Sequence, residues 1–428
     1  MMSHLPRILI QVGAILLAAR CVGLIFRKLG QPQVMGEMIA GILLGPSLLG
    51  WALPGVSAAL FPPESLGSLN SLSQVGLLLF MFLVGLELDP VSFGRRGHSA
   101  VLISHASIGI PFFLGVVLAL YLYPRLADDS VRFTHFALFL GTAMSVTAFP
   151  VLARILTERN LLRSDVGAMT IACAAVDDVT AWCILAGVSL LVHANGAAVP
   201  LWLTVGGSVA YVIVMLWVAR KALRRLEINY RARGEMTQDM LAIVLLLLWL
   251  SAAVTEWLGI HALFGAFLMG VVMPRSQRFR RVLSEKLHDI AVVLLLPLYF
   301  AFTGLRTNIG SLSGTEMGIY FTAIVGIAIA GKFGGATLSA RLTGMTWRES
   351  GAIGILMNTR GLMELVVLNI GLDLGIISPA LFAMMTLMAL VTTFLTTPVL
   401  EWIYPVRLYW TESAVIDRFG LGSRVHTK

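Results

Sequence analysis

The chain has 428 residues, of which 57% are hydrophobic and only 13% are charged. Because soluble domains carry about 25% charged residues, this composition excludes a soluble globular protein and indicates a polytopic membrane protein. The formal net charge of +8 does not indicate a nucleic-acid partner, since the basic residues lie between apolar runs, where they orient membrane helices.

The cysteine pattern argues against several further kinds of site. Cys21, Cys173 and Cys183 lie inside apolar segments and lack the spacing of metal ligands. Single cysteines in such segments pack as small hydrophobic side chains. We therefore expect no disulfide framework, no resident metal and no cofactor.

The hydropathy pattern predicts an all-α membrane protein. An apolar run of about 20 residues is long enough to cross a bilayer as a helix, and thirteen such runs follow one another with short loops between them. The predicted spans, numbered one to thirteen, are residues 7–26, 32–49, 66–88, 98–122, 133–157, 166–192, 201–219, 238–257, 261–273, 289–305, 317–340, 350–371 and 379–404. They form one transmembrane domain, residues 1–405, which is followed by a short basic tail, residues 406–428.

The basic residues predict the orientation of these spans. With the N-terminus outside, 24 of the 31 Lys and Arg residues fall on the cytoplasmic side, 4 fall outside and 3 lie within spans. Cytoplasmic loops carry an excess of Lys and Arg, and a wrong span count would scramble the alternation. We therefore predict an outside N-terminus, a cytoplasmic C-terminus and a location in the bacterial inner membrane.

Spans three and ten contain an internal repeat. The segment LFMFLVGLELD (residues 79–89) aligns without gaps with LYFAFTGLRTN (residues 298–308), at an offset of 219 residues. The same offset brings span five onto span twelve. Seven spans separate the members of each pair, and because seven is odd, the two halves cross the membrane in opposite directions. Inverted repeats of this kind are typical of secondary transporters.

Span five is predicted to be interrupted near the middle of the membrane. Its sequence GTAMSVTAFPVLARIL (residues 141–156) contains Pro150, which has no amide hydrogen and disfavours helix at Phe149. The break frees backbone carbonyl groups, and Ser145 and Thr147 lie beside it. Oxygen atoms are the ligands that hard cations prefer, so we predict that Ser145 and Thr147 take part in ion binding.

Span six places two carboxylates, Asp177 and Asp178, at the centre of an apolar run. One acid at this depth costs about 2.5–3.5 kcal/mol on insertion scales, so two adjacent acids indicate a functional site. Adjacent residues on a helix point in different directions, so the two carboxylates cannot face the same neighbour. We predict that one of them has a fixed charged partner and that the other faces a cavity.

Spans eleven and twelve supply basic side chains. Lys332 is the only lysine inside a predicted span, and the small residues of AIAGKFGGA around it allow close helix contact. Span twelve, MNTRGLMELVVLNIG (residues 357–371), has a polar run at residues 358–361, which predicts a second interrupted helix that crosses the first. Arg360 and Glu364 are four residues apart on this span and are predicted to pair.

Six motifs occur in order along the chain: GEMIAGILLGP (36–46), LLLFMFLVGLELD (77–89), SVTAFPVLARIL (145–156), VDDVTAW (176–182), PLYFAFTGLRTNI (297–309) and MNTRGLMELVVLNIG (357–371). Together they resemble the monovalent cation:proton antiporter-2 family. The resemblance covers essentially the whole chain, and the motifs of spans five, six and twelve are closest in wording to the potassium/proton exchanger branch of this family.

This resemblance implies roles for the charged residues. It implies that Asp178 binds the cation and the proton alternately, while Asp177 forms an ion pair with Lys332. Competition for one carboxylate would enforce exchange, because a bare buried charge is costly to carry through the membrane barrier and either ligand neutralises it.

The resemblance also implies the architecture of the sodium/proton antiporter fold and a homodimer. Spans one to three and eight to ten, about residues 7–88 and 238–305, would form a scaffold. Spans four to six and eleven to thirteen, about residues 98–192 and 317–404, would form a moving core. Span seven, residues 201–219, would link the two.

The sequence therefore predicts a secondary active antiporter, and not an enzyme, that exchanges a monovalent cation for protons within the lipid bilayer. K⁺ is the favoured cation and Na⁺ is the alternative. A proton-coupled transporter of an organic solute on the same fold is a second candidate. A cation channel is a third, although the repeated ligand rings of a pore are not visible. An intramembrane aspartyl protease is disfavoured, because adjacent carboxylates on one helix cannot face each other across a scissile bond.

Overall fold

The structure is a computed structural model that describes residues 4–87, 97–159, 161, 164–193, 201–258 and 261–405. All the regular elements in these ranges are helical, which confirms the predicted all-α class. Most are α-helices, whereas η2, η3 and η5 are π-helical and η4 is a 3-10 turn. In chain order the elements are α1(His4–Lys28), α2(Gln33–Leu44), α3(Leu49–Ala52), α4(Pro54–Leu60), α5(Pro63–Glu87), α6(Gly97–Leu126), α7(Phe133–Ser145), α8(Phe149–Glu158), α9(Asp165–His193), α10(Leu201–Ile213), η2(Val214–Ala219), α11(Arg220–Arg233), α12(Gln238–Trp257), α13(Ala262–Val272), α14(Gln277–His288), η3(Asp289–Leu295), α15(Leu296–Leu305), η4(Ile309–Leu312), α16(Thr315–Ile329), η5(Ala330–Gly334), α17(Gly335–Leu342), α18(Trp347–Met357), α19(Leu362–Asp373) and α20(Pro379–Ile403).

The helices match the predicted spans in order. Within the described ranges, eleven helical runs are long and apolar enough to cross a membrane, and α7 and α13 are shorter apolar helices. The span predicted at residues 201–219 is longer than expected, because the basic segment that follows continues the helix as α11 to Arg233. The predicted tail, residues 406–428, lies outside the described residues.

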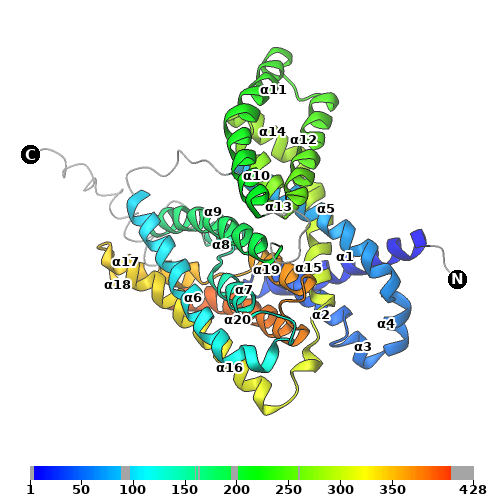
Figure 1. The fold of residues 1–428 in the computed structure, drawn as a ribbon, viewed down its shortest axis with the longest axis vertical. Helices are drawn as coiled ribbons and strands as arrows, with labels where there is room; N and C mark the ends of the chain where they lie inside the picture. The colour runs from blue at the N-terminus through cyan, green and yellow to red at the C-terminus, as the bar shows by residue number, and fades with distance from the viewer. Residues whose placement is uncertain are drawn as a thin grey trace, which may run out of the picture.

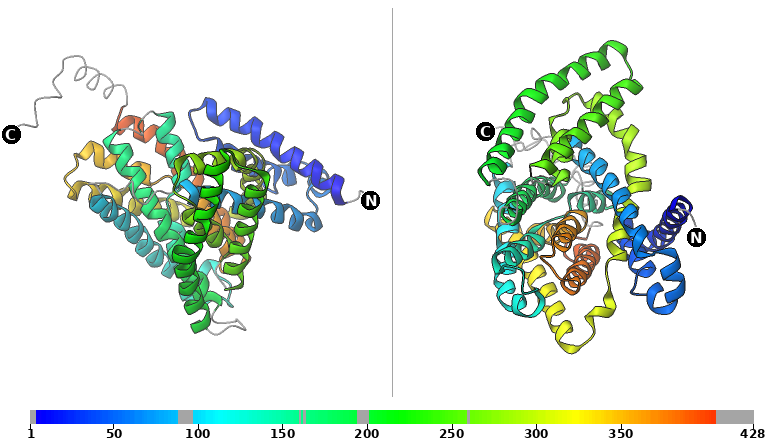
Figure 2. Two further views of the ribbon diagram at one scale, coloured as in Figure 1. Left: turned by 90° about the horizontal axis from the view of Figure 1, so that it is seen from above. Right: turned by 45° about the vertical axis from the view of Figure 1, so that its right-hand side comes forward.

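The helices pack as two groups. The scaffold helices, α1–α5 and α12–α15, contact one another extensively where α13 packs on α5 and α15 packs on α2. The core helices, α6–α9 and α16–α20, form a second unit in which α6 contacts α7, α9 and α17. Figure 1 shows most of the core helices together at the lower left, with α1–α4 at the right and α11 and α12 at the top. In the right-hand view of Figure 2, α1 (dark blue) again lies at the right and the green helices at the top, apart from most of the core helices. Which group moves during transport stays a prediction.

Glycines set the close approach of the scaffold helices and explain the internal repeat. Gly304 of α15 lies against α2, where an added Cβ atom would meet the carbonyl oxygen of Met38. Gly85 of α5 lies as close to α13, where a Cβ atom would meet the carbonyl oxygen of Phe267. Gly85 and Gly304 are the two residues that the repeat aligns. In each half of the chain, the third span therefore packs on the second span of the other half, and the contact is made through the equivalent glycine.

We expect Gly304→Ala to destabilise the protein, because its Cβ atom cannot fit without separating α15 from α2. Overpacking a core costs about 1–3 kcal/mol, so the melting temperature of the purified protein should fall. The control is Gly326→Ala in α16, where a Cβ atom meets nothing within 4 Å and alanine favours the helix. Equal melting temperatures for the two variants would contradict this account of the helix contact.

Candidate functional site

The two interrupted helices meet through their non-helical segments. Residues 146–148 separate α7 from α8, and residues 358–361 separate α18 from α19. The amide of Ala148 donates a hydrogen bond to the carbonyl oxygen of Thr359, at 3.0 Å. The most apolar window of the run Trp347–Asp373 is entirely buried. Protein therefore covers this irregular backbone, as a break at membrane depth requires.

The break in span five lies slightly before its predicted position. The sequence predicts that helix is disfavoured at Phe149, but α8 begins at that residue. Pro150 lies in the first turn of α8, where an amide hydrogen is not needed for the helical hydrogen bonds. The proline therefore starts the second half of the helix, and the non-helical residues are those before it.

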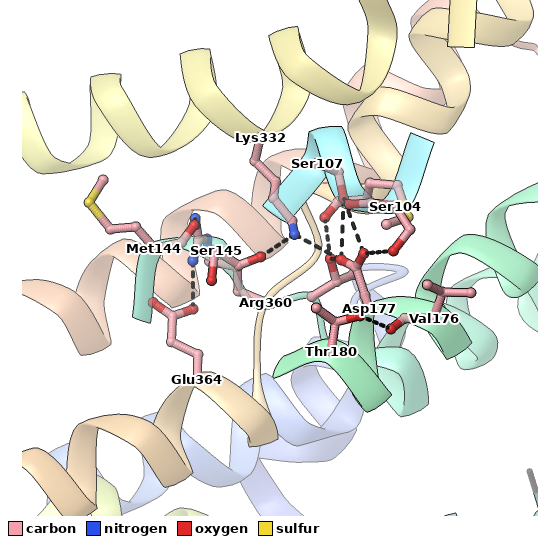
Figure 3. Close-up of polar contacts among 12 residues, drawn as sticks. Ser104, Ser107, Met144, Ser145, Val176, Asp177, Thr180, Lys332, Arg360 and Glu364 are labelled. Atoms are coloured by element: carbon pink, nitrogen blue, oxygen red, sulfur yellow. Dashed lines mark hydrogen bonds and ion pairs between the residues drawn. The ribbon is translucent and has the colours of Figure 1, made fainter. Parts of the chain in front are cut away.

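Basic side chains neutralise the carboxyl end of α7. Arg360 donates hydrogen bonds to the carbonyl oxygens of Ala143 and Met144, at 2.8 and 2.7 Å. Lys332 donates to the carbonyl oxygen of Ser145, the last residue of the helix. Figure 3 shows both side chains reaching this point, Lys332 from η5 and Arg360 from the segment between α18 and α19. The carboxyl end of a helix carries a partial negative charge and unpaired carbonyl groups, and these cations satisfy both.

Asp177 is surrounded by donors from three other parts of the core. Ser104 donates to its Oδ1 atom at 2.6 Å, and Ser107 lies 3.2 and 3.3 Å from its two oxygens. Thr147 donates to Oδ2 at 2.6 Å, and the ammonium group of Lys332 lies 2.9 Å from the same atom. The residue is fully buried. A buried carboxylate is tolerated when it is both paired and hydrogen-bonded, and Asp177 meets both conditions.

The position of Lys332 depends on small residues and on a π-helical segment. Lys332 lies within η5, inside the helical run of span eleven. Beside it, Gly331 and Gly335 lie so close to α6 that Cβ atoms would be 3.0 Å from Pro111 and 3.3 Å from the carbonyl oxygen of Ala106. This contact places η5 beside α6, so that Lys332 and the two serines of α6 reach the same carboxylate, Asp177. Short π-helical segments inside α-helices are frequent at functional sites.

Asp178 lies on a different face of α9 from Asp177. One turn further along α9, Trp182 stacks on Phe267 of the scaffold helix α13, with ring centroids 5.9 Å apart. Residues i and i+4 share a helix face, so Asp178 lies on the side of the core that faces the scaffold. It is 1% exposed, and its Oδ1 atom has no hydrogen-bond partner among the described residues. Asp177 is thus fully engaged, whereas Asp178 keeps a free oxygen.

The buried charges at the crossing do not balance. When ionised, Asp177, Asp178 and Glu364 carry three negative charges, against two positive charges on Lys332 and Arg360. Each of these five residues is at most 1% exposed. Glu364 and Arg360 pair at 3.4 Å, which adds no net charge. One further positive charge, from a monovalent cation or a proton, would neutralise the cluster, and an uncompensated buried charge is costly.

The two hydroxyl groups expected to bind a cation are engaged by the protein. Ser145 donates its hydroxyl to the carbonyl oxygen of Thr142 at 2.8 Å. Thr147 lies within hydrogen-bond distance of Asp177 and also of the carbonyl oxygen of Met357, at 3.1 Å. Both residues lie at the crossing of the interrupted helices. Direct contact between either hydroxyl and a cation stays a prediction.

Ser104 and Ser107 were not selected from the sequence. They lie three residues apart in span four, within ISHASIG, a spacing that puts both on one helix face. Two hydroxyl groups on one face of an apolar membrane helix were a usable signal, since polar side chains at this depth seek partners. Their partner could not be identified without the packing of α6 on α9.

A cavity of about 350 Å³ separates the two helix groups on one side of the crossing. Scaffold residues such as Phe80 and Leu296 line it together with core residues such as Phe149 and Leu362. The lining is apolar except for Arg154 and His288. Both of these lie on the side that the basic loops predict to be cytoplasmic.

Comparison with known proteins gives concordant matches over most of the chain. Residues 14–404 match the family model described as "Sodium/hydrogen exchanger, transmembrane". The chain is 41% identical over 399 residues to the Na(+)/H(+) antiporter NhaS4 of Synechocystis, covering 93% of this chain and 97% of that protein. It is 40% identical over 402 residues to cation/H(+) antiporter 17 of Arabidopsis thaliana and 36% identical over 413 residues to K(+)/H(+) antiporter 1 of Saccharomyces cerevisiae. The chain spans about half the length of these two relatives, 48% and 47% respectively.

A solved structure shares the fold. The sodium proton antiporter MjNhaP1 from Methanocaldococcus jannaschii superposes with a TM-score of 0.64, over 95% of this chain and 99% of that one. The two sequences are only 14% identical. The match therefore supports the architecture and carries no information on the transported ion.

The contact between Lys332 and Asp177 predicts a coupled effect on stability. Removing one partner of a buried pair leaves an uncompensated charge and typically costs about 3–5 kcal/mol, so Lys332→Ala should lower the melting temperature markedly. Adding Asp177→Asn to that variant should recover part of the loss. A double-mutant cycle on the melting temperature is the measurement, and simple additivity of the two substitutions would rule out the pair.

Proposed function

We propose that this chain, which belongs to the sodium/hydrogen exchanger family, exchanges a monovalent cation for protons across the membrane. One observation carries the proposal. Of two adjacent buried acids, Asp177 is engaged by four donors, whereas Asp178 retains a free oxygen on the face toward the scaffold. We assign Asp178 as the shared binding site and Asp177 as the fixed partner of Lys332.

Exchange follows from the charge balance of the site. With Asp178 bare, the buried cluster has one excess negative charge, and moving that charge through the barrier is costly. A bound proton or a bound cation removes the excess, and the two ligands cannot occupy the same carboxylate together. The core helices therefore move readily between the two sides of the membrane when Asp178 holds a proton or a cation. They move poorly when Asp178 holds no ligand. This coupling needs no separate gate for each ion.

K⁺ is the proposed physiological cation, and Na⁺ is the second candidate. Two arguments support K⁺: the wording of the motifs in spans five, six and twelve, and the similarity to a yeast K(+)/H(+) antiporter. The cyanobacterial relative is named for Na⁺ instead, so the choice needs a direct measurement. We further propose a homodimer in the bacterial inner membrane, with the N-terminus outside and the C-terminus in the cytoplasm.

Asp178→Asn tests the site assignment. The amide keeps the shape of the side chain but cannot lose a proton, so it removes the alternation between two bound states. Cation-dependent proton flux in proteoliposomes should fall below about a tenth of the unaltered rate, with folding preserved. The control is Asp165→Asn, at the exposed start of the same helix. Exchange retained by Asp178→Asn, at a rate like that of the control, would refute the assignment.

The identity of the cation is tested in the same vesicles. We expect proton flux to saturate at a lower concentration of K⁺ or Rb⁺ than of Na⁺ or Li⁺. A lower half-saturating concentration for Na⁺ would reverse the assignment to K⁺. Proton flux that responds to none of the four cations would refute cation exchange altogether and would favour an organic solute.

A further inference from the structure

Polar side chains connect the core to the scaffold on one side of the crossing. Arg306, at the end of α15, donates to Asn369 of α19 at 3.0 Å and to Asp373 of the same helix at 2.6 Å. The amide group of Asn369 also donates to Thr303 at 3.0 Å and lies 3.4 Å from the hydroxyl of Tyr299. We name Arg306, Asn369 and Asp373 the latch residues.

The exposed fraction of the latch residues increases from the protein interior to the surface. Asn369 is 4% exposed, whereas the side chains of Arg306 and Asp373 are 24% and 46% exposed. The guanidinium group of Arg306 also lies 5.9 Å from the ring of Phe382, on the core helix α20. The network therefore joins the two helix groups continuously, from the buried part of α19 to the protein surface.

The cavity between the two helix groups lies on the opposite side of the membrane from the latch. His288, which lines the cavity, and Arg306 are 18 residues apart on the helical run Gln277–Leu312, a rise of about 27 Å. On the His288 side a cavity of about 350 Å³ lies between the groups, and one of the described hydrogen bonds joins them there, from Gln31 to the carbonyl oxygen of Phe394 at 3.3 Å. On the Arg306 side they are joined by hydrogen bonds and an ion pair. The two groups are therefore joined more tightly on the Arg306 side than on the Arg154 side, as expected of a state that is closed toward Arg306.

We propose that the latch residues hold the Arg306 face closed and must release before that face can open. The proposal rests on the exchange function proposed above. When α19 slides along α15, the guanidinium of Arg306 loses both partners on α19. The amide of Asn369 loses Thr303 and Tyr299 while it keeps the carbonyl oxygen of Leu365 in its own helix. A buried polar group without partners is unfavourable, so the latch biases the equilibrium toward the state seen here. Its strength sets the share of molecules that open on each face.

Arg306→Met tests the latch, since methionine keeps a long side chain but donates no hydrogen bonds. The half-saturating K⁺ concentration for proton flux is measured on each face, in right-side-out and inside-out membrane vesicles. Apparent affinity scales with the population of the competent state. The half-saturating concentration should therefore fall on the Arg306 face and rise on the Arg154 face, each by about threefold or more. Shifts in the same direction on both faces, or no shift, would overturn the proposal.

The matched control is Arg125→Met. Arg125 lies at the end of α6 on the predicted outer side, and it contacts the carbonyl oxygen and the ring of Tyr121 in its own helix. The same substitution there should leave both half-saturating concentrations unchanged. Asp373→Asn removes only the more exposed ion pair and should shift both values in the same directions as Arg306→Met, by less. If Arg306→Met does not fold, Asp373→Asn tests the proposal in its place.

A second measurement separates the latch from the exchange function. Hydrogen exchange of the purified protein, followed by mass spectrometry, requires no transport. Amides of α19 and of the end of α15 should exchange faster in Arg306→Met than in Arg125→Met. If the unaltered protein shows no cation-dependent proton flux, the proposed function fails and this measurement alone decides the latch. Equal exchange in the two variants would then overturn it.

Discussion

The arrangement at the membrane centre depends on keeping one carboxylate, Asp177, charged and satisfied away from water. That single requirement recruits two hydroxyl groups from α6, one from the break between α7 and α8, and an ammonium group from η5. Four segments far apart in the sequence are thereby fixed at one point. The glycines beside Lys332 follow from the same need, because a larger side chain would hold α6 away from η5. Packing and charge compensation are one constraint here.

The two interrupted helices serve the same constraint. An uninterrupted α7–α8 helix would use its own carbonyl groups internally and offer none to a cation. The break leaves the carbonyl groups of residues 143–145 for Arg360 and Lys332. These two bases therefore have partners whether or not a carboxylate nearby changes its charge. The cluster can gain or lose one positive charge without leaving a basic side chain unpaired.

Much of this could be predicted from the sequence, because the relevant signals are local. Span positions follow from hydropathy, and the two breaks follow from a proline and from a polar run at residues 358–361. The alignment of Gly85 with Gly304 by itself indicates that the two halves of the chain are inverted. The resemblance to a family supplied the choice of Asp178 over Asp177, which the residues alone did not decide. The donors Ser104 and Ser107, and the contacts of Arg306 with α19, depend on how helices are rotated and shifted against each other. That information is not local, and no periodicity contains it.

The helix contacts are of two kinds, and their distribution agrees with the proposed displacement of the core against the scaffold. Inside the scaffold, Gly85 and Gly304 bring backbones together, and such contacts cannot slide without collision. Inside the core, the hydrogen bonds and the ion pair of Asp177 join α6, α9 and η5, and because they are buried, breaking them is costly. Between the two groups the described contacts are of another kind: a stacked pair of rings, an apolar cavity, the polar bonds of Arg306 and Asn369 near one surface, and a hydrogen bond from Gln31 to the carbonyl oxygen of Phe394. Strong contacts therefore lie within each group and exchangeable ones lie between them. Asp178 lies on the face of the core at this weaker boundary, so a rigid displacement of the core would carry the ligand proposed for Asp178 past the scaffold and leave the hydrogen bonds of Asp177 intact.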